Sequence, residues 1–168
     1  MLKVDIRKAY GLVNWRFLEN VFLGLHFPIH MVKLIMACVS NVSCSLCINN
    51  DMQSPFHAKK GLRQEDPLSP YLFVIIMEYL SRMLQSLWLK DGFHGHPKCK
   101  RLKLINLAFA YDILVFCRAD LSSMLAIKGI FHNFAAASGL HISPEKSSVF
   151  FCGISHDLKL LILSQLQF

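Results

Sequence analysis

Charged residues are scarce in this sequence, at 17%, yet it lacks the long uncharged apolar run that a membrane-spanning helix needs. Its most apolar stretch, residues 70–89, is interrupted by Glu78 and Arg82, whereas a span takes about 20 consecutive apolar residues. The opening residues have no basic region followed by an apolar one, which is the pattern of a secretory signal. We therefore expect no membrane association, and we expect the protein in the nucleus or cytoplasm.

Internal repeats, low-complexity segments and linkers rich in proline or glycine are also absent from the sequence. The apolar share of 54% and the mean hydropathy of +0.39 exclude intrinsic disorder. A chain of 168 residues is long enough for one domain with a sizeable core, since a chain of about 150 residues buries roughly two-thirds of its unfolded surface. We therefore treat residues 1–168 as a single domain.

The six cysteines lack the spacing of a zinc site. With no secretory signal, their thiols are expected to be reduced. Cys44 and Cys47 are close in sequence, but they stand among strand-forming residues, and positions three apart on a strand point to opposite faces. His94 and His96, with Cys99, form an equally weak group in a predicted loop. Neither group supplies four convergent ligands, so we predict no zinc site.

Positive charge is in excess, and part of it is concentrated in one short segment. Eighteen lysines and arginines against eleven acidic residues give a net charge of +7, with a pI near 9.2. Residues 98–103 contain four of the basic side chains. This charge suits a polyanionic partner such as nucleic acid, although moderate basicity also occurs in proteins that bind none.

The apolar periodicities predict a mixture of strands and helices. Strands are predicted at residues 2–7, 42–48, 54–58, 104–109, 113–117 and 149–153. Helices are predicted at residues 15–25, 29–39, 69–89 and 157–166, with another of about eighteen residues between Asp120 and Gly139. This order of elements predicts an α+β fold in which helices pack on an antiparallel sheet.

Local signals support several of these boundaries. Asn14 is a plausible cap for the first helix, and Pro28 is allowed in the first turn of the second. Residues 49–51, Asn-Asn-Asp, form a strong hairpin signal between the second and third strands. The apolar stripe predicted for the long central helix consists of Leu72, Ile76, Leu80, Met83 and Leu87.

Two aspartates are placed where a folded sheet would bring them together. Asp5 lies on the first predicted strand, and Asp112 lies at the tip of the hairpin formed by residues 104–117. Hard divalent cations prefer carboxylate oxygens, and phosphoryl-transfer sites commonly hold two such ions about 3.5–4 Å apart. Asp112 is equally an ordinary turn residue, and Asp5 alone is equally consistent with a solvated strand position.

Three segments around these aspartates stand in a characteristic order. They read VDIRKAY at residues 4–10, GLRQEDPLSP at 61–70 and FAYD at 109–112, and Lys146-Ser147 and the weaker FFCG at 150–153 follow them. Together they resemble the palm of reverse transcriptases from non-LTR (LINE-type) retrotransposons, of a plant-like kind. The second segment differs from the family's GLRQGDPLSP only at Glu65. The resemblance covers essentially the whole chain.

The resemblance implies the palm of an RNA-directed DNA polymerase, with the fingers and thumb largely missing from residues 1–168. Asp5 and Asp112 would bind two Mg²⁺ ions, and Tyr10 would lie beneath the incoming sugar, although Tyr10 is also consistent with a core aromatic. The residues that match the family's nucleotide contacts are Arg63, Gln64 and Lys146. The implied partners are an RNA template, a DNA primer and deoxynucleoside triphosphates.

Three departures from the family fall on the implied chemistry. Tyr111 stands where the family has its second principal metal-binding aspartate, and a phenol, protonated at neutral pH, is a poor ligand for Mg²⁺. Glu65 replaces a glycine, and its side chain costs about 1–2 kcal/mol if the backbone there needs φ > 0. Gly11 replaces an aspartate and weakens the local structure. We therefore expect this copy to be catalytically inactive.

Two alternatives remain open. The first is a non-catalytic basic RNA-binding module, motivated by residues 98–103. The second is an unfolded retroelement fragment without a function, whose exposed phenylalanines and leucines promote aggregation.

Overall fold

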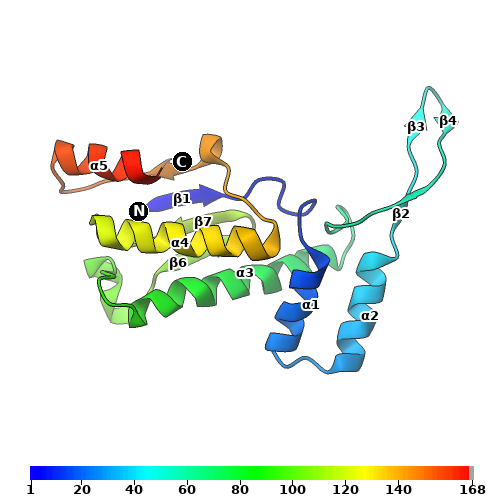
Figure 1. Ribbon diagram of the computed structural model, residues 1–168, viewed down its shortest axis with the longest axis horizontal. Helices are drawn as coiled ribbons and strands as arrows, with labels where there is room; N and C mark the ends of the chain where they lie inside the picture. The colour runs from blue at the N-terminus through cyan, green and yellow to red at the C-terminus, as the bar shows by residue number, and fades with distance from the viewer. Residues whose placement is uncertain (167–168) are drawn as a thin grey trace.

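The computed structural model describes residues 1–166, and a four-stranded sheet lies at its centre (Figure 1). The strands are β1 (Leu2–Asp5), β6 (Asn106–Phe109), β7 (Asp112–Val115) and β8 (Ser148–Val149). They lie in the order β6-β7-β1-β8, and each neighbouring pair is antiparallel. The predicted α+β architecture, with helices packed on an antiparallel sheet, is confirmed.

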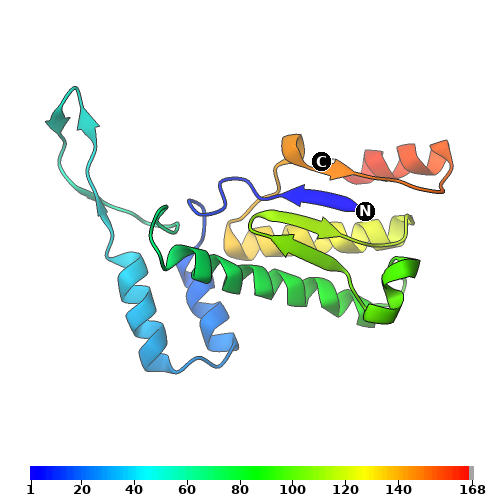
Figure 2. The same ribbon diagram turned by 180° about the vertical axis from the view of Figure 1, so that it is seen from behind.

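One face of the sheet is covered by α3 (Ser69–Gln85) and α4 (Leu121–Ser138), and α5 (His156–Leu166) packs in turn against α4 (Figure 1). Asp120 caps α4 and Gly139 ends it in the left-handed conformation, both as predicted. Figure 2 shows the opposite face of the sheet, which is not covered by a helix from residues 1–166. That face is where solvent-exposed strand residues lie.

Alternation along the strands explains why one face is buried. Leu2 and Val4 on β1, with Ile113 and Val115 on β7, are at most 1% exposed. The residues between them are only partly buried. Since successive side chains of a strand point to opposite faces, the apolar set meets α3 and α4 while the other set lines the open face.

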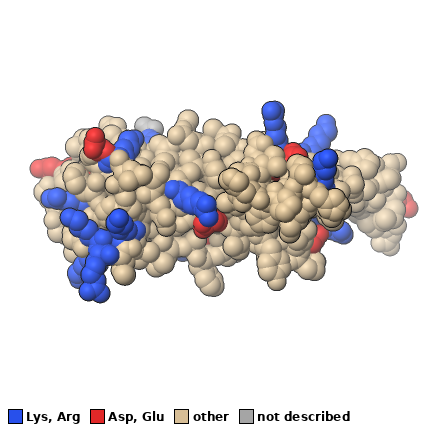
Figure 3. Space-filling view, turned by 90° about the horizontal axis from the view of Figure 1, so that it is seen from below, with Lys and Arg blue, Asp and Glu red and all other residues tan. Residues whose placement is uncertain are grey.

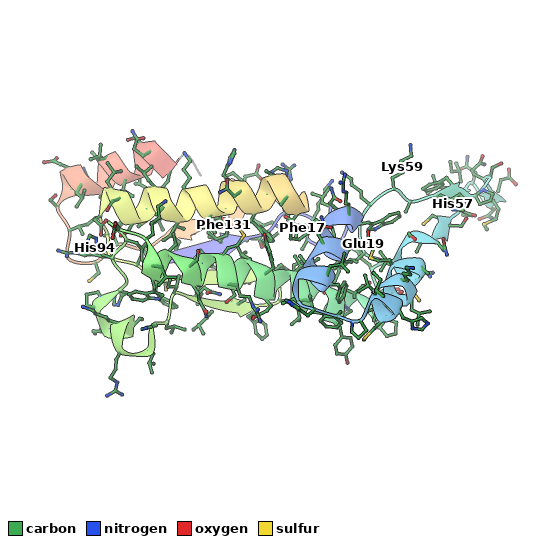
Figure 4. The ribbon with its side chains drawn as sticks, turned by 60° about the horizontal axis from the view of Figure 1, so that its bottom comes forward. Phe17, Glu19, His57, Lys59, His94 and Phe131 are labelled. Atoms are coloured by element: carbon green, nitrogen blue, oxygen red, sulfur yellow. The ribbon has the colours of Figure 1, made fainter. Side chains whose placement is uncertain are left out.

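A second pair of helices begins with α1 (Trp15–Gly24), which is capped by Asn14 as predicted. The Asn14 side-chain oxygen accepts hydrogen bonds from two backbone N–H groups of the first turn, at 2.9 and 3.2 Å. Phe17 points from α1 toward the main body (Figure 4). Its ring lies 5.3 Å from that of Tyr79 on α3 and 6.0 Å from that of Phe134 on α4, both edge to face. Phe17 therefore joins α1 to the helices that carry the sheet.

After α2 (Ile29–Ser40), which packs on α1, residues 42–58 form a hairpin arm that projects from the body (Figure 1). The pairs are β2 (Ser43–Cys44) with β5 (Phe56–His57) and β3 (Cys47–Ile48) with β4 (Asp51–Met52). The hairpin and its turn are as predicted, with Asn49 and Asn50 at φ 52° and 69°. The two predicted strands are shorter and interrupted, because Pro55 has no N–H to donate to the ladder.

Several boundaries differ from the prediction. The basic residues before β6 form a 3₁₀ helix, η2 (Pro97–Leu102), which ends at Lys103 with φ 48°, so β6 begins only at Asn106. The last predicted strand is confined to β8. The long helix changes at Gln85 into a 3₁₀ turn, η1 (Ser86–Leu89). Leu84 is fully buried where the predicted stripe had Met83, which is only partly buried.

By length and composition, residues Ser69–Leu89 form the one helical stretch within 1–166 that is long and apolar enough to cross a membrane. Its apolar side is used inside the protein, because Leu72, Ile76 and Leu80 are at most 2% exposed among the core side chains. Central helices of globular domains commonly share this property.

We expect Ile76→Ala to destabilise the chain by about 2–5 kcal/mol, because it leaves a cavity in a fully buried site. Val74, on the same helix, is 65% exposed, so Val74→Ala is the matched control and should change stability by at most about 0.5 kcal/mol. Urea unfolding followed by circular dichroism measures both. A parent chain that unfolds without a cooperative transition would favour the unfolded-fragment alternative.

Candidate active site

The predicted pair of aspartates meets at one end of the sheet. Asp5 and Asp112 lie directly opposite each other in the β1–β7 pairing. The Ile6 N–H donates to the Tyr111 carbonyl oxygen at 3.3 Å, so Ile6 and Tyr111 form a hydrogen-bonded pair. Asp5 and Asp112 are therefore the adjacent non-hydrogen-bonded pair, in which the Cα atoms are about 4.5 Å apart and the side chains share one face.

The segment that contains Lys146 is fastened to Asp5. The Asp5 N–H donates to Ser147 Oγ at 3.2 Å, and the Asp5 carbonyl oxygen accepts from the Ser143 N–H at 2.8 Å. Ser147 Oγ in turn donates to the Ser143 carbonyl oxygen at 2.7 Å. These bonds hold the 3₁₀ turn η3 (Pro144–Lys146) beside the aspartate pair. The hydrogen bonds of Ser147 thus keep the neighbouring Lys146 at the site.

A cavity of about 430 Å³ opens at this end of the sheet. Its walls include five of the predicted site residues, namely Asp5, Tyr10, Gln64, Tyr111 and Lys146. An adjoining cavity of about 510 Å³ shares Tyr10, Gln64 and Tyr111 and adds Arg63. Asp112 is opposite Asp5 but does not line either cavity. The fold therefore gathers residues that are more than 130 positions apart in the sequence.

The loop of residues 59–68 is docked onto the loop that follows β1. The Leu62 N–H donates to the Tyr10 carbonyl oxygen at 2.7 Å, and Trp15 Nε1 donates to the Gly61 carbonyl oxygen at 2.7 Å. Gly61 has φ 91°, and a Cβ there would lie 2.8 Å from the Gly11 carbonyl oxygen. Only glycine fits this close approach, which places Arg63 and Gln64 beside Tyr10.

Tyr10 packs against the core and also lines the cavities, and its contact with an incoming sugar stays a prediction. Its ring lies 5.1 Å from that of Phe73 on α3, and it also lines both cavities. An aromatic side chain packed from below in this way is held still.

Tyr111 lies in the two-residue loop that joins β6 to β7. Ala110, the other loop residue, has φ 52°, and Phe109 and Asp112 pair on either side. The Tyr111 residue is 47% exposed and reaches both cavities. Tyr111 thus lines the same cavity as Asp5 without contributing a carboxylate.

Sequence reasoning missed several charged residues that lie around Asp5. Arg7, Lys8 and Glu145 line the same cavity as Asp5. Their signal was present, since Arg7 and Lys8 belong to the first motif and Glu145 adjoins Lys146. On the open face of the sheet, Lys3 Nζ lies 3.5 Å from Asp112 Oδ1. Cationic groups therefore outnumber the two predicted metal ligands.

The ligand set does not fit a pair of metal ions. Within residues 1–166, no group of three or more histidine, cysteine, aspartate or glutamate side chains is placed to hold a metal. Asp5 and Asp112 offer carboxylate oxygens suited to one hard cation. Tyr111, where the resemblance leads us to expect a further carboxylate, carries a phenol.

The backbone conformation differs at Glu65 and Gly11, the other two positions at which the sequence departs from the family motifs. Glu65 has φ 66°, so the condition for strain at this position is met. Gly11 is outside the left-handed region, and a Cβ there would meet only the Lys8 carbonyl oxygen, at 3.9 Å. Position 11 therefore accepts a side chain, and its glycine is not required by the fold.

An antiparallel sheet backed by two helices, with paired aspartates beside a hairpin loop, defines the palm of a nucleic-acid polymerase. Residues 1–164 match the family described as reverse transcriptase (RNA-dependent DNA polymerase). The chain belongs to this family. Reverse transcriptases generally use divalent metal ions.

Two relatives are retroelement proteins. The chain is 25% identical over 146 residues to a retrovirus-related Pol polyprotein from the type-1 retrotransposable element R2 of Popillia japonica, covering 87% of this chain and 23% of the relative. It is 25% identical over 151 residues to the transposon TX1 uncharacterized 149 kDa protein of Xenopus laevis, covering 88% and 11%. The chain thus spans less than a quarter of the curated relatives it matches. The resemblance to reverse transcriptases of non-LTR retrotransposons is confirmed, and the plant-like kind stays a prediction.

Solved structures of telomerase share the fold. Telomerase from Candida albicans, in complex with a fragment of telomeric RNA, has a TM-score of 0.68 at 14% identity, covering 92% of this chain and 27% of that one. Apo telomerase from Candida tropicalis has a TM-score of 0.67 at 14% identity, covering 92% and 31%. The predicted polymerase-palm fold is confirmed by this likeness.

We expect Glu65→Gly to stabilise the chain by up to about 1.5 kcal/mol. It relieves roughly 1–2 kcal/mol of left-handed strain and returns about 0.5–1 kcal/mol as backbone entropy of the unfolded chain. Glu65→Ala is the matched control, because it removes the carboxylate but keeps the Cβ, so it should gain less. Urea unfolding of the three proteins measures the difference. A gain in Glu65→Ala equal to that in Glu65→Gly would show that charge, not backbone strain, sets the cost.

Proposed function

We propose that the chain is the palm of a LINE-type reverse transcriptase that has lost its polymerase activity. The observation that carries this proposal is the Asp5–Asp112 pair, opposite in the sheet, with Tyr111 in the adjoining loop where the family has a further carboxylate. The remaining residues of the site are gathered around the same two cavities. The pocket of an RNA-directed DNA polymerase is thus kept while its ligand set is not.

Each side chain has a role that follows from its chemistry. Asp5 and Asp112 would hold Mg²⁺, which when bound neutralises phosphate charge. Arg63 presents a planar fork of donors to phosphate oxygens. The cavity-facing Tyr10 ring supports the sugar of a deoxynucleoside triphosphate. Gln64 and Lys146 complete the nucleotide contacts, and an RNA template with a DNA primer would lie along the open face of the sheet.

Two features oppose catalysis. The phenol of Tyr111 does not replace a carboxylate ligand, which leaves two carboxylates for chemistry that uses two ions. Glu65 lines the same cavity as Arg63. A carboxylate about 6 Å from a phosphate charge adds roughly 2–3 kcal/mol of repulsion at an effective dielectric near 20. Together these two features weaken the binding of both the metal ion and the nucleotide.

We expect the purified chain to show no primer extension above the background of its Asp5→Asn/Asp112→Asn variant, with Mg²⁺ or Mn²⁺, on an RNA template with a DNA primer.

We expect the folded state of Tyr111→Asp to be stabilised by Mn²⁺, by about 1.4 kcal/mol when the free Mn²⁺ concentration is tenfold above Kd. Leu89→Asp is the matched control, because Leu89 is 91% exposed in η1 and gains the same charge away from the site.

Extension by the parent chain would contradict the loss of activity. Equal Mn²⁺ stabilisation of Tyr111→Asp and Leu89→Asp would contradict the assignment of Tyr111 to a ligand position.

A second function is supported by a separate surface. Figure 3 shows lysine and arginine side chains gathered at one end of the molecule, the end that holds η1 and η2 in Figure 1. The exposed basic residues there are Lys98, Lys100, Arg101 and Lys103. Such a patch suits non-catalytic binding of RNA through its phosphates.

We expect Lys100→Ala/Arg101→Ala to weaken RNA binding and to lower the slope of log K against log salt by about 1.4 for single-stranded RNA, if each side chain contacts one phosphate. Arg16→Ala/Lys33→Ala removes the same charge from exposed positions on α1 and α2 and should leave the slope nearly unchanged. Fluorescence anisotropy with a labelled oligonucleotide measures both. Binding that is absent or insensitive to salt would remove this function.

A further inference from the structure

Lys3 is placed to act on the aspartate pair. It lies two residues before Asp5 on β1, so both side chains point to the open face of the sheet. In the pairing with β7, Lys3 is opposite Leu114 and Asp5 is opposite Asp112, so Lys3 and Asp112 are diagonal neighbours. The Lys3 Nζ atom lies 3.5 Å from Asp112 Oδ1.

A nearby cation would reduce the repulsion between the Asp5 and Asp112 carboxylates. Like charges directly opposite each other in an antiparallel pair repel and destabilise the sheet. With the Lys3 ammonium group, the net charge of Lys3, Asp5 and Asp112 together is −1, whereas the two carboxylates alone carry −2. The other cations near Asp5, which are Arg7, Lys8 and Lys146, line the cavity, whereas Lys3 approaches Asp112, which does not line it.

We infer that Lys3 is an internal counter-ion of the Asp5–Asp112 pair, and that it competes with a divalent cation for Asp112. The ammonium group and the metal ion both seek the same carboxylate oxygens. A metal that binds the pair must displace the Lys3 ammonium or bear its repulsion. Lys3 thus sets how weakly this site binds metal, beyond the missing ligand at Tyr111.

The inference rests on the proposed assignment of Asp5 and Asp112 as the cation site, and it does not require the chain to polymerise. Its test therefore uses Mn²⁺ alone. Binding is measured on the full chain by electron paramagnetic resonance of free Mn²⁺, at fixed ionic strength. Thermal unfolding in EDTA and in Mn²⁺ is followed alongside, which shows that each variant is folded.

Lys3→Met keeps the length of the side chain and removes its charge, and Lys3→Arg keeps the charge. We expect Lys3→Met to bind Mn²⁺ at least about fivefold more tightly, since two unit charges about 4 Å apart change an affinity by about this factor even in water and Mn²⁺ carries two charges. Lys3→Arg should stay within twofold of the parent. Lys33→Met, on the exposed side of α2, is the control for net charge and should leave the affinity unchanged.

Asp112→Asn makes the test specific. In that background, Lys3→Met should raise the affinity for Mn²⁺ by less than it does in the parent, because the carboxylate for which Lys3 and the metal compete is gone. The inference is overturned if Lys3→Met binds Mn²⁺ no better than the parent, if its gain is undiminished in the Asp112→Asn background, or if Lys33→Met gives the same gain.

A further variant separates this inference from the proposed function. If Asp5→Asn lowers Mn²⁺ binding while Lys3→Met has no effect, the cation site stands and only the role of Lys3 fails. If Asp5→Asn has no effect either, the cation site itself fails, and the role of Lys3 fails with it.

Discussion

The register between β1 and β7 is the constraint on which the site depends. It sets Leu2 against Val115 and Val4 against Ile113, so four buried side chains lock the pairing from the helical side. The same register sets Asp5 against Asp112 on the open side. A slip by one residue would turn the apolar side chains outward and separate the carboxylates. The core and the site are thus two faces of one pairing.

The loops are fastened to this pairing at both sides. Ser143 and Ser147 bond the Asp5 backbone, and Leu62 bonds the Tyr10 carbonyl oxygen just beyond β1. Phe73 supports Tyr10 from α3. Residues from three distant parts of the chain therefore take their positions from the short segment that contains Asp5.

Much of the fold could be predicted because its signals are local. Asn14, Asp120 and Gly139 mark helix ends by backbone chemistry alone, and alternation identifies β1 and β7. The 3₁₀ helix η2 could not be predicted, because it depends on Pro97 and on the left-handed Lys103 more than on any apolar period. The interruption of the hairpin strands was missed because the effect of Pro55 depends on which residues pair across the hairpin, and the sequence alone does not give this register.

The site was predicted unevenly for a similar reason. Motifs pointed to Asp5, Asp112 and Tyr10, and the fold brings these together. The contact between Lys3 and Asp112 was not foreseen, since it depends on a diagonal across two strands, which requires the register. The positive φ of Glu65 was foreseen only as a condition, because glycine in the family's motif signals backbone freedom without proving its use.

The exposed loop that carries Tyr111 has a consequence for how such a protein would be treated in a cell. Chaperones and proteases act on unfolded chains, so they respond to lost stability and not to lost chemistry. A change in a half-exposed two-residue loop leaves the buried face of β7 untouched. Protein quality control would therefore respond little to which side chain stands at position 111, whatever that side chain does to the chemistry of the site.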